Sequence, residues 1–310
     1  MKLYVAHTEM TPSRRKKETL IAPSPEFALL PERQDLRHSK QTVTGAVGRA
    51  FSILEFLNSS QRGWNISEMS RKLRIPKSTT HVLVSTLDQL GYIRRYQSSR
   101  RFQLSPKMFG LGRDALRTLP LPEIAIPHLQ WLVQSTRLAA HVGILEKRQV
   151  VFIQKVEGPG IIKFDTYIGK CSELHCTALG KSLLAFQSEE TIQAILSKYS
   201  FHRFTKKTIS THAALLEELS RVRQNGYSMD NEEEELGVRC IASPILVAGK
   251  AAAAVSVTGT TSQIYPEVVD KLITTIKRLA ARISASLENS TQDVSLQKEQ
   301  RTFSLHKAQR

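Results

Sequence analysis

The sequence has few cysteines, few acidic residues and no long hydrophobic run, and these shortages limit what the protein can be. Cys171, Cys176 and Cys240 are too few and odd in number for a disulfide scaffold, so a cytoplasmic location is expected. No stretch approaches the roughly 18 apolar residues of a membrane helix, and the first 20 residues lack the apolar core of a secretory signal. The 28 acidic residues face 44 basic ones, a net charge of +16 that predicts a polyanionic partner.

The positive charge is concentrated in one part of the chain. The 310 residues suffice for two domains at about 150 residues each. Gly45–Arg117 carries 13 basic and 4 acidic residues, whereas Thr118–Ser290 carries 19 and 17. This asymmetry predicts one domain that contacts nucleic acid and another with a different task. Residues 1–44, which contain four prolines and a basic run, and residues 291–310 are predicted to be disordered tails.

The order of elements in the basic segment is typical of a winged helix-turn-helix domain over residues 45–105. Apolar spacing predicts a helix over 46–57, a second that begins after Ile66, with Ser67 as N-cap, and runs to Leu73, and a third over 77–90. Pro76 separates the last two helices, and Gly91 ends the third. We expect Val82, Leu83, Leu87 and Leu90 on the inner side of this third helix.

The third helix begins with small polar and basic side chains that suit contacts in the major groove: Lys77, Ser78, Thr79, Thr80 and His81. Two short strands over 92–96 and 101–104 then form a hairpin whose arginines are expected to contact phosphates: Arg94, Arg95, Arg100 and Arg101. Together these features predict binding to double-stranded DNA.

At this point the sequence resembles the IclR family of bacterial transcriptional regulators. The N-terminal likeness is carried by Ile75–Thr79 and Leu87–Tyr92, and the resemblance continues to about Leu287. It implies a linker helix over 106–121 and a GAF-like effector-binding domain over 122–290. It also implies a homodimer or homotetramer on a palindromic operator. The family usually has arginine where this chain has Val82, so the operator sequence is expected to differ.

In the second half, the hydrophobic period changes to that of strands mixed with helices. Strands are predicted over 140–145, 150–156, 161–166, 241–247 and 252–257, and helices over 124–136, 177–186, 188–199, 212–224 and 266–287. Because they do not alternate strictly, they predict an α+β domain around an antiparallel sheet.

Two motifs in this half, Leu174–Ala185 and Gly226–Pro244, resemble those of the family. The resemblance implies that a small organic or aromatic acid binds between the sheet and the start of the helix that begins after Thr177, where free N–H groups attract anions. The implied effector residues are Ile161, Phe164, Ala178, Leu179, Asp230, Val238, Cys240, Ser256 and Thr258.

Other interpretations of these residues remain open. Ile161, Phe164 and Val238 suit a ligand-free core equally well, and Cys240 suits a small buried hydrophobe. A buried Asp230 facing a carboxylate is unfavourable unless it is protonated or paired. Ser256 and Thr258 alternate so that they share one face of a strand, which favours the ligand site.

Catalytic and metal sites find less support. Gly180-Lys181-Ser182 ends like a phosphate-binding loop, but His175 replaces the first glycine of that pattern. Cys171, His175 and Cys176 do not have the spacing of a common zinc site, and His175 is expected to be structural. We therefore expect no enzyme activity, metal or cofactor. We predict a transcriptional regulator that represses a catabolic operon rather than activating one. The alternative is a constitutive DNA-binding protein whose second domain only forms oligomers.

Overall fold

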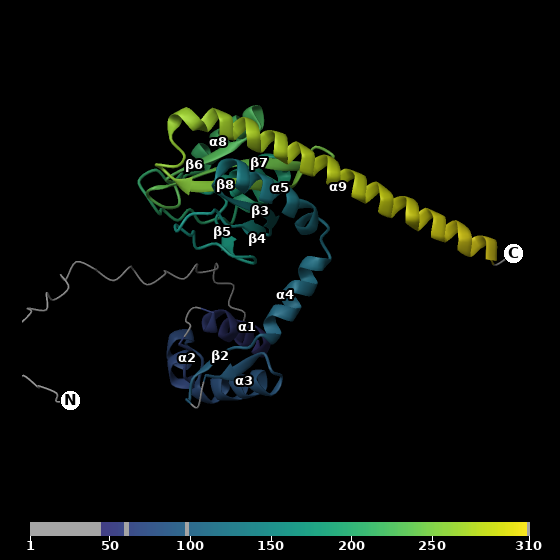
Figure 1. Ribbon diagram of the computed structural model, residues 1–310. Helices are drawn as coiled ribbons and strands as arrows, with labels where there is room; N and C mark the ends of the chain where they lie inside the picture. Colours follow the sequence, from purple (N-terminus) through teal and green to yellow (C-terminus); the bar gives the residue numbers. More distant parts are fainter. Residues whose placement is uncertain (1–44, 59–61, 97–98, 309–310) are drawn as a thin grey trace, which may run out of the picture. The chain divides into compact units, whose positions relative to one another are not determined.

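The computed structural model describes residues 45–58, 62–96 and 99–308, with side chains up to residue 290 (Figure 1). The chain divides into two compact units, with the boundary between Leu104 and Ser105. Each unit is described separately. The predicted basic extension over 1–44 lies outside the described residues. Within the described part, no helix combines the length and the apolarity needed to cross a membrane.

The first unit is a three-helix domain with a small two-stranded sheet. Its elements are α1 (Ala46–Leu57), α2 (Ile66–Leu73), α3 (Lys77–Gln89), β1 (Ile93–Arg95) and β2 (Phe102–Leu104). The two strands pair antiparallel, with Arg94 opposite Gln103. The core is formed by apolar side chains from all three helices and both strands: Ile53, Leu57, Met69, Val84, Ile93 and Phe102. The predicted helix-turn-helix with a small wing is confirmed.

Two details of this unit differ from the predictions. Asn65, not Ser67, caps α2: its side chain accepts from the Glu68 amide, and the Glu68 carboxylate accepts from the Asn65 amide. This reciprocal pair satisfies two donors that a helix start leaves free. On α3, the buried face consists of Thr80, Val84 and Leu87. The predicted inward placement of Val82 and Leu90 is wrong, because both are exposed: Val82 lies off this three-and-four spacing, and Leu90 follows the last residue of α3.

The second unit contains a six-stranded antiparallel sheet of order β5-β4-β3-β8-β7-β6. Its strands are β3 (Ala139–Glu146), β4 (Gln149–Val156), β5 (Cys171–Ser172), β6 (Ser228–Asn231), β7 (Val238–Val247) and β8 (Lys250–Thr260). Its helices are α4 (Lys107–Arg117), α5 (Leu121–Thr136), α6 (Ala178–Ala185), α7 (Glu189–Leu196), α8 (His212–Asn225) and α9 (Pro266–Ala308). The predicted antiparallel α+β architecture is confirmed.

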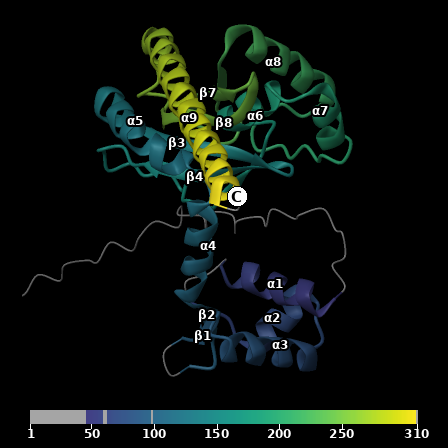
Figure 2. The same ribbon diagram turned by 90° about the vertical axis from the view of Figure 1, so that its right-hand side faces the viewer.

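Helices cover both faces of this sheet (Figure 2). On one face, α5 and α9 pack against branched residues such as Val142, Ile241 and Val257. On the other face, α6 packs against the sheet, and residues of α7 and α8 join the same hydrophobic cluster as Phe152, Ala242 and Ala254. The small residues on this second face let α6 lie close to the sheet. The candidate ligand site lies on this side.

Three predictions for the second unit are wrong. Residues 161–166 form no strand; Gly158, Pro159 and Gly160 precede them, and the segment is an irregular loop. The short strands β5 and β6 were missed because they carry no apolar alternation. The last helix continues to Ala308 instead of ending at Leu287. No glycine or proline follows Pro266, so nothing in the sequence interrupts this helix.

Candidate DNA interface and candidate ligand site

The start of α3 is the first candidate site. Its exposed or half-buried side chains are Lys77, Ser78, Thr79 and His81. Thr80 differs from its neighbours, because it is 0% exposed and its hydroxyl donates to the Pro76 carbonyl at 3.1 Å. The Thr80 side chain is therefore not at the surface of this structure, and its predicted contact with DNA stays a prediction. This hydroxyl instead holds the first turn of α3 against the chain that precedes it.

Val82 belongs to the exposed face of α3, although the sequence reasoning placed it inside. Its side chain is 62% exposed and follows directly after His81. The spacing of Thr80, Val84 and Leu87 was the signal that could have shown this. An exposed valine among polar groups offers a thymine methyl an apolar contact.

The four arginines of the wing fall into two groups. Arg94 and Arg100 are exposed, and Arg95 is exposed with its guanidinium 5.6 Å from the centre of the Phe102 ring. Arg101 is half-buried and donates to both oxygens of Glu68, each at 3.2 Å, and to the Gly63 carbonyl at 3.0 Å. The hydrogen bond from the Asn65 amide and the charge of Arg101 lower the pKa of Glu68. Because its guanidinium is bound by Glu68 and Gly63, Arg101 ties the wing to α2 in this structure, and its phosphate contact stays a prediction.

The second candidate site is a group of polar side chains on the α6 side of the sheet. Asp230 lies opposite Cys240, and Cys240 lies opposite Thr258. Ser256, two residues before Thr258 on the same face of β8, lies opposite His141. Directly opposed residues point to the same face of a sheet. Four strands therefore bring together a set that we call the polar cluster: His141, Asp230, Cys240, Ser256 and Thr258.

The start of α6 adjoins this face. Thr177 caps the helix by accepting from the Gly180 amide at 3.0 Å, and Ala178 and Leu179 are buried. The Ser228 hydroxyl donates to the Ala178 carbonyl at 2.5 Å, which fixes the helix to β6. The positive end of the helix dipole therefore lies on the side of the sheet that carries the polar cluster.

His141 is a site residue that the sequence reasoning missed. It is buried, its Nε2 lies 2.9 Å from the Thr166 hydroxyl, and its Nδ1 lies 3.4 Å from the Thr258 hydroxyl. Burial, together with the charges of Lys155 and Lys170, lowers the pKa of His141 to about 3. The imidazole is therefore neutral at physiological pH and can both donate and accept one hydrogen bond.

The predicted apolar wall lies at the edge of this site. Ile161 is 99% exposed, and Phe164 and Val238 are half-buried. Ile161, Phe164 and Thr258 line a pocket of about 140 Å³, whereas Asp230, Cys240 and Ser256 are not part of its lining. The structure thus brings two of the predicted wall residues to one end of the polar cluster, where they do not enclose it.

Burial sets the ionisation of Asp230. Its side chain is 1% exposed, and its carboxylate accepts from the Glu233 amide at 2.7 Å. Burial raises the pKa of Asp230 to about 7, supported by the charges of Glu233 and Glu234 and opposed by the amide hydrogen bond and by Lys181. Near neutral pH this carboxyl is therefore partly protonated. A protonated Asp230 can donate to a carboxylate, which removes the objection to a buried acid in an anion site.

The contacts and burial of His175 and Cys176 account for both residues without a metal site or a catalytic nucleophile. The Nδ1 of buried His175 lies 2.9 Å from the Tyr199 hydroxyl, and its Nε2 lies 2.9 Å from the His202 carbonyl. Burial raises the pKa of the Cys176 thiol, so it is no activated nucleophile. Among the described residues, no group of three or more His, Cys, Asp or Glu side chains is arranged to hold a metal ion. The structural role expected for His175 is confirmed.

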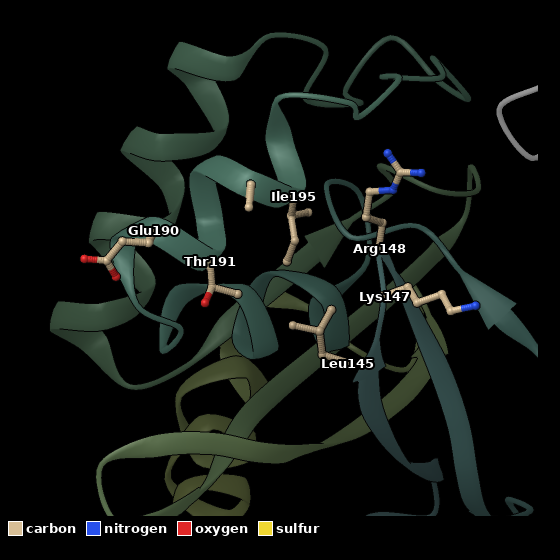
Figure 3. A pocket seen from close by; sticks show the side chains of 7 residues that line it. Leu145, Lys147, Arg148, Glu190, Thr191 and Ile195 are labelled. Carbon is tan, nitrogen blue, oxygen red and sulfur yellow. The ribbon is translucent and has the colours of Figure 1, made fainter. Parts of the chain in front are cut away.

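A larger surface depression, of about 530 Å³, lies between the β3–β4 turn and α7 (Figure 3). Leu145, Thr191 and Ile195 lie towards its centre, whereas the charged ends of Glu190 and Lys147 point to opposite sides. Recognition of a small ligand requires polar groups that converge on it. This depression lacks that arrangement, so the polar cluster is the better candidate.

Both candidate sites lie within regions that match known families. Residues 46–96 match the IclR helix-turn-helix domain, and residues 113–285 match the C-terminal domain of bacterial transcriptional regulator IclR. The two matches cover the start of α3, the first wing strand and the whole polar cluster.

Individual proteins extend this comparison. The chain is 32% identical over 254 residues to the HTH-type transcriptional regulator KdgR of Escherichia coli, covering 82% of this chain and 96% of KdgR. It is 28% identical over 248 residues to the acetate operon repressor of Salmonella typhimurium, covering 78% of this chain and 90% of the repressor. Its fold matches an IclR homolog of Microbacterium hydrocarbonoxydans in complex with 4-hydroxybenzoate, with a TM-score of 0.68 and 23% identity, covering 79% of this chain and 100% of that one.

Proposed function

Since the chain belongs to the IclR family of bacterial transcriptional regulators, which are not enzymes, we propose that it binds a palindromic operator and responds to a small acid. Relatives of the chain include named repressors, so repression of a catabolic operon is the mode that we propose. A regulator of this kind acts in the cytoplasm.

The DNA-binding half of this proposal rests mainly on the start of α3. Lys77, Ser78 and His81 are exposed at the end of a helix whose opposite face is buried in the core. In a helix-turn-helix protein this end of the second helix enters the major groove. We assign base and phosphate contacts to Lys77, Ser78, Thr79 and His81, and backbone contacts to Arg94, Arg95 and Arg100.

Footprinting of the purified protein on genomic DNA tests this half directly. We expect protected sites with two inverted half-sites, because two copies related by two-fold symmetry read symmetric sequences. Light scattering of the protein with and without DNA would distinguish a homodimer from a homotetramer. Failure to retard any fragment of the host chromosome at modest ionic strength would contradict the proposal.

The effector half rests on the polar cluster beside the start of α6. We propose that a small organic or aromatic acid places its carboxylate near the α6 N-terminus and protonated Asp230, while Cys240, Ser256 and Thr258 contact its remaining groups. Ala178 and Leu179 supply backbone N–H groups, and Ile161, Phe164 and Val238 cover the ligand from the loop and the start of β7. His141 joins the set as a neutral hydrogen-bonding group.

A thermal-shift screen of small carboxylates tests the effector half. A ligand that binds only the folded state raises the unfolding temperature. We expect at least one acid from a panel that includes pyruvate, gluconate and 4-hydroxybenzoate to stabilise the protein and to change operator affinity. If no member of a broad panel has an effect, a constitutive DNA-binding protein with an oligomerising second domain is the better description.

The domain limits remain part of this proposal. We assign residues 45–105 to DNA binding, 106–121 to a linker that includes α4, and 122–290 to effector binding. Coupling through the linker must be reciprocal, so operator DNA is expected to change effector affinity by the same factor by which the effector changes operator affinity. Equal effector affinity with and without operator DNA would contradict this coupling.

A further inference from the structure

Lys181 is a fully buried lysine on α6, next to the candidate effector site. Its side chain is 1% exposed, although lysine is almost never buried in proteins unless it is paired. Its ammonium nitrogen donates to the Met229 carbonyl at 2.5 Å and to Glu233 Oε1 at 2.6 Å. A third partner, Glu218 Oε1 on α8, lies 3.6 Å away. The ammonium therefore makes two hydrogen bonds and a longer ion pair with Glu218.

The partners of Lys181 lie on both sides of Asp230. Met229 precedes Asp230 in β6, and Glu233 follows it by three residues in the turn after the strand. The Glu233 amide in turn donates to the Asp230 carboxylate at 2.7 Å. Lys181 thus connects α6, which carries Ala178 and Leu179 at its start, to both ends of the segment that presents Asp230.

Stability alone is a poor explanation for this arrangement. Burying an ammonium and a carboxylate costs desolvation free energy, and apolar residues of similar volume often stabilise a fold as well or better. The network is also incomplete, because Glu233 Oε2 is buried without a hydrogen-bond partner among the described residues. A buried polar network does restrict the relative positions of the segments that it joins, because its hydrogen bonds form only when donors and acceptors are correctly placed.

We propose that Lys181 is a positioning residue of the effector site: it holds the Asp230 turn at a fixed place relative to the start of α6 without touching the ligand. This inference rests on the proposed effector function. It adds a residue that the family motif for the ligand contacts did not supply, and it gives the lysine of the Gly180-Lys181-Ser182 sequence a role unrelated to phosphate binding.

The same geometry makes Lys181 an electrostatic neighbour of Asp230. The charged groups around Asp230 are Glu233 and Glu234, from its own turn, and Lys181, from α6. The thiols of buried Cys176 and half-buried Cys240 also adjoin it. Lys181 favours the ionised form of Asp230, and the two glutamates favour the protonated form. Removing Lys181 or Glu233 should therefore move the titration of Asp230 in opposite directions.

The first test needs no effector. The unfolding temperature of the full chain is measured from pH 5 to pH 9 for the wild type, Lys181→Met, Lys181→Arg and Glu233→Gln. Each protein is paired with the same protein carrying Asp230→Asn, and the difference isolates the contribution of Asp230. We expect the pH midpoint of the Asp230 contribution to rise by about one pH unit in Lys181→Met. It should fall in Glu233→Gln and stay in place in Lys181→Arg.

A lysine that merely fills space gives a different result. Its replacement would lower the unfolding temperature at all pH values and leave the Asp230 midpoint unchanged, and this outcome would overturn the proposal. If Lys181→Met does not fold, the downward shift in Glu233→Gln and the unchanged midpoint in Lys181→Arg decide the question. An upward shift or no shift in Glu233→Gln would then count against it.

The second test uses the probes pyruvate, gluconate and 4-hydroxybenzoate. For any probe that stabilises the wild type, we expect Lys181→Met to weaken binding about tenfold and Lys181→Arg to retain most of the affinity. Unchanged binding in Lys181→Met would overturn the positioning role. If no probe stabilises the wild type, the proposed effector function loses support, whereas the pH midpoints still decide the role of Lys181.

Discussion

The two units place the polar groups of their candidate sites in opposite environments. In the first unit, Lys77, Ser78 and His81 are exposed at the start of α3, and the fold behind them is apolar. In the second unit, Asp230, Ser256 and His141 are buried between the sheet and α6. A surface that contacts DNA can be solvent-exposed before binding, whereas a site for a small acid must enclose the ligand.

This difference has consequences for how each site is built. The exposed groups of α3 need only a rigid helix, and Thr80 supplies rigidity by donating to the Pro76 carbonyl. The buried groups depend on one another for hydrogen bonds, as in the contacts of Thr258 with Cys240 and His141. The free-energy changes of substitutions in the first site should therefore be additive, whereas those of substitutions in the second site should depend on one another.

Ionic strength gives the largest expected separation between the two sites. If the proposed dimer uses two copies of Lys77, Arg94 and Arg100, six phosphate contacts are expected, and raising salt from 50 to 200 mM should weaken DNA binding roughly a thousandfold. Effector affinity should change by less than about threefold, because buried charges are screened little. Fluorescence anisotropy and calorimetry measure the two affinities. Equal salt dependence of both would remove the distinction between an exposed and a buried site.

Ser78 tests the specificity of the exposed site. Ser78→Ala should weaken binding to the operator about tenfold or more, because each lost base contact costs about 1–3 kcal/mol, and should leave non-specific DNA binding unchanged. Gln89, which is exposed at the far end of the same helix, provides the control in Gln89→Ala. A similar loss in both variants would show that the start of α3 does not read bases.

Much of the fold could be predicted because its signals are local. The apolar spacing over 46–57 defines α1, and Pro76 marks the break before α3. Residues 161–166 were misread as a strand because Ile161 and Ile162 are branched and apolar, as in a strand. The preceding Gly-Pro-Gly directs them into an exposed loop instead.

The parts that could not be predicted depend on contacts between distant residues. His141 and Thr258 meet across 117 positions of the chain, and Arg101 and Glu68 across 33. Nothing in the local sequence indicates either pair. The same limit applies to Lys181: its local sequence shows only an incomplete phosphate-loop pattern, because its partners Met229 and Glu233 lie on a distant strand and turn.

The pH dependence of effector binding tests the buried site. Because the pKa of Asp230 is raised to about 7, affinity for a carboxylate should fall up to tenfold per pH unit above that value. The folded protein also binds this proton more tightly than the unfolded chain. The corresponding stability is full below the ordinary pKa of 3.8 and is lost as pH rises through about 7.

Asp230→Asn provides the control for this pH dependence. An amide donates at every pH, so affinity for a carboxylate should become nearly independent of pH between 6 and 8 in this variant. Calorimetric titration with a stabilising acid measures both proteins. A wild-type affinity that does not change between pH 6 and pH 8 would contradict a ligand carboxylate that meets Asp230.

Arg100 and Arg101 give the smallest but most closely matched comparison, because they are neighbours in sequence with different environments. Arg100 is exposed, so Arg100→Ala should lower the slope of the salt dependence by about one per contact and leave the unfolding temperature unchanged. Arg101 is bound by Glu68 and the Gly63 carbonyl. Arg101→Ala should therefore destabilise the first unit by about 1 kcal/mol and leave the salt slope unchanged. Salt titration and thermal unfolding of both variants measure this contrast. If Arg101→Ala lowers the slope of the salt dependence as Arg100→Ala does, the ion pair between Arg101 and Glu68 opens when DNA binds.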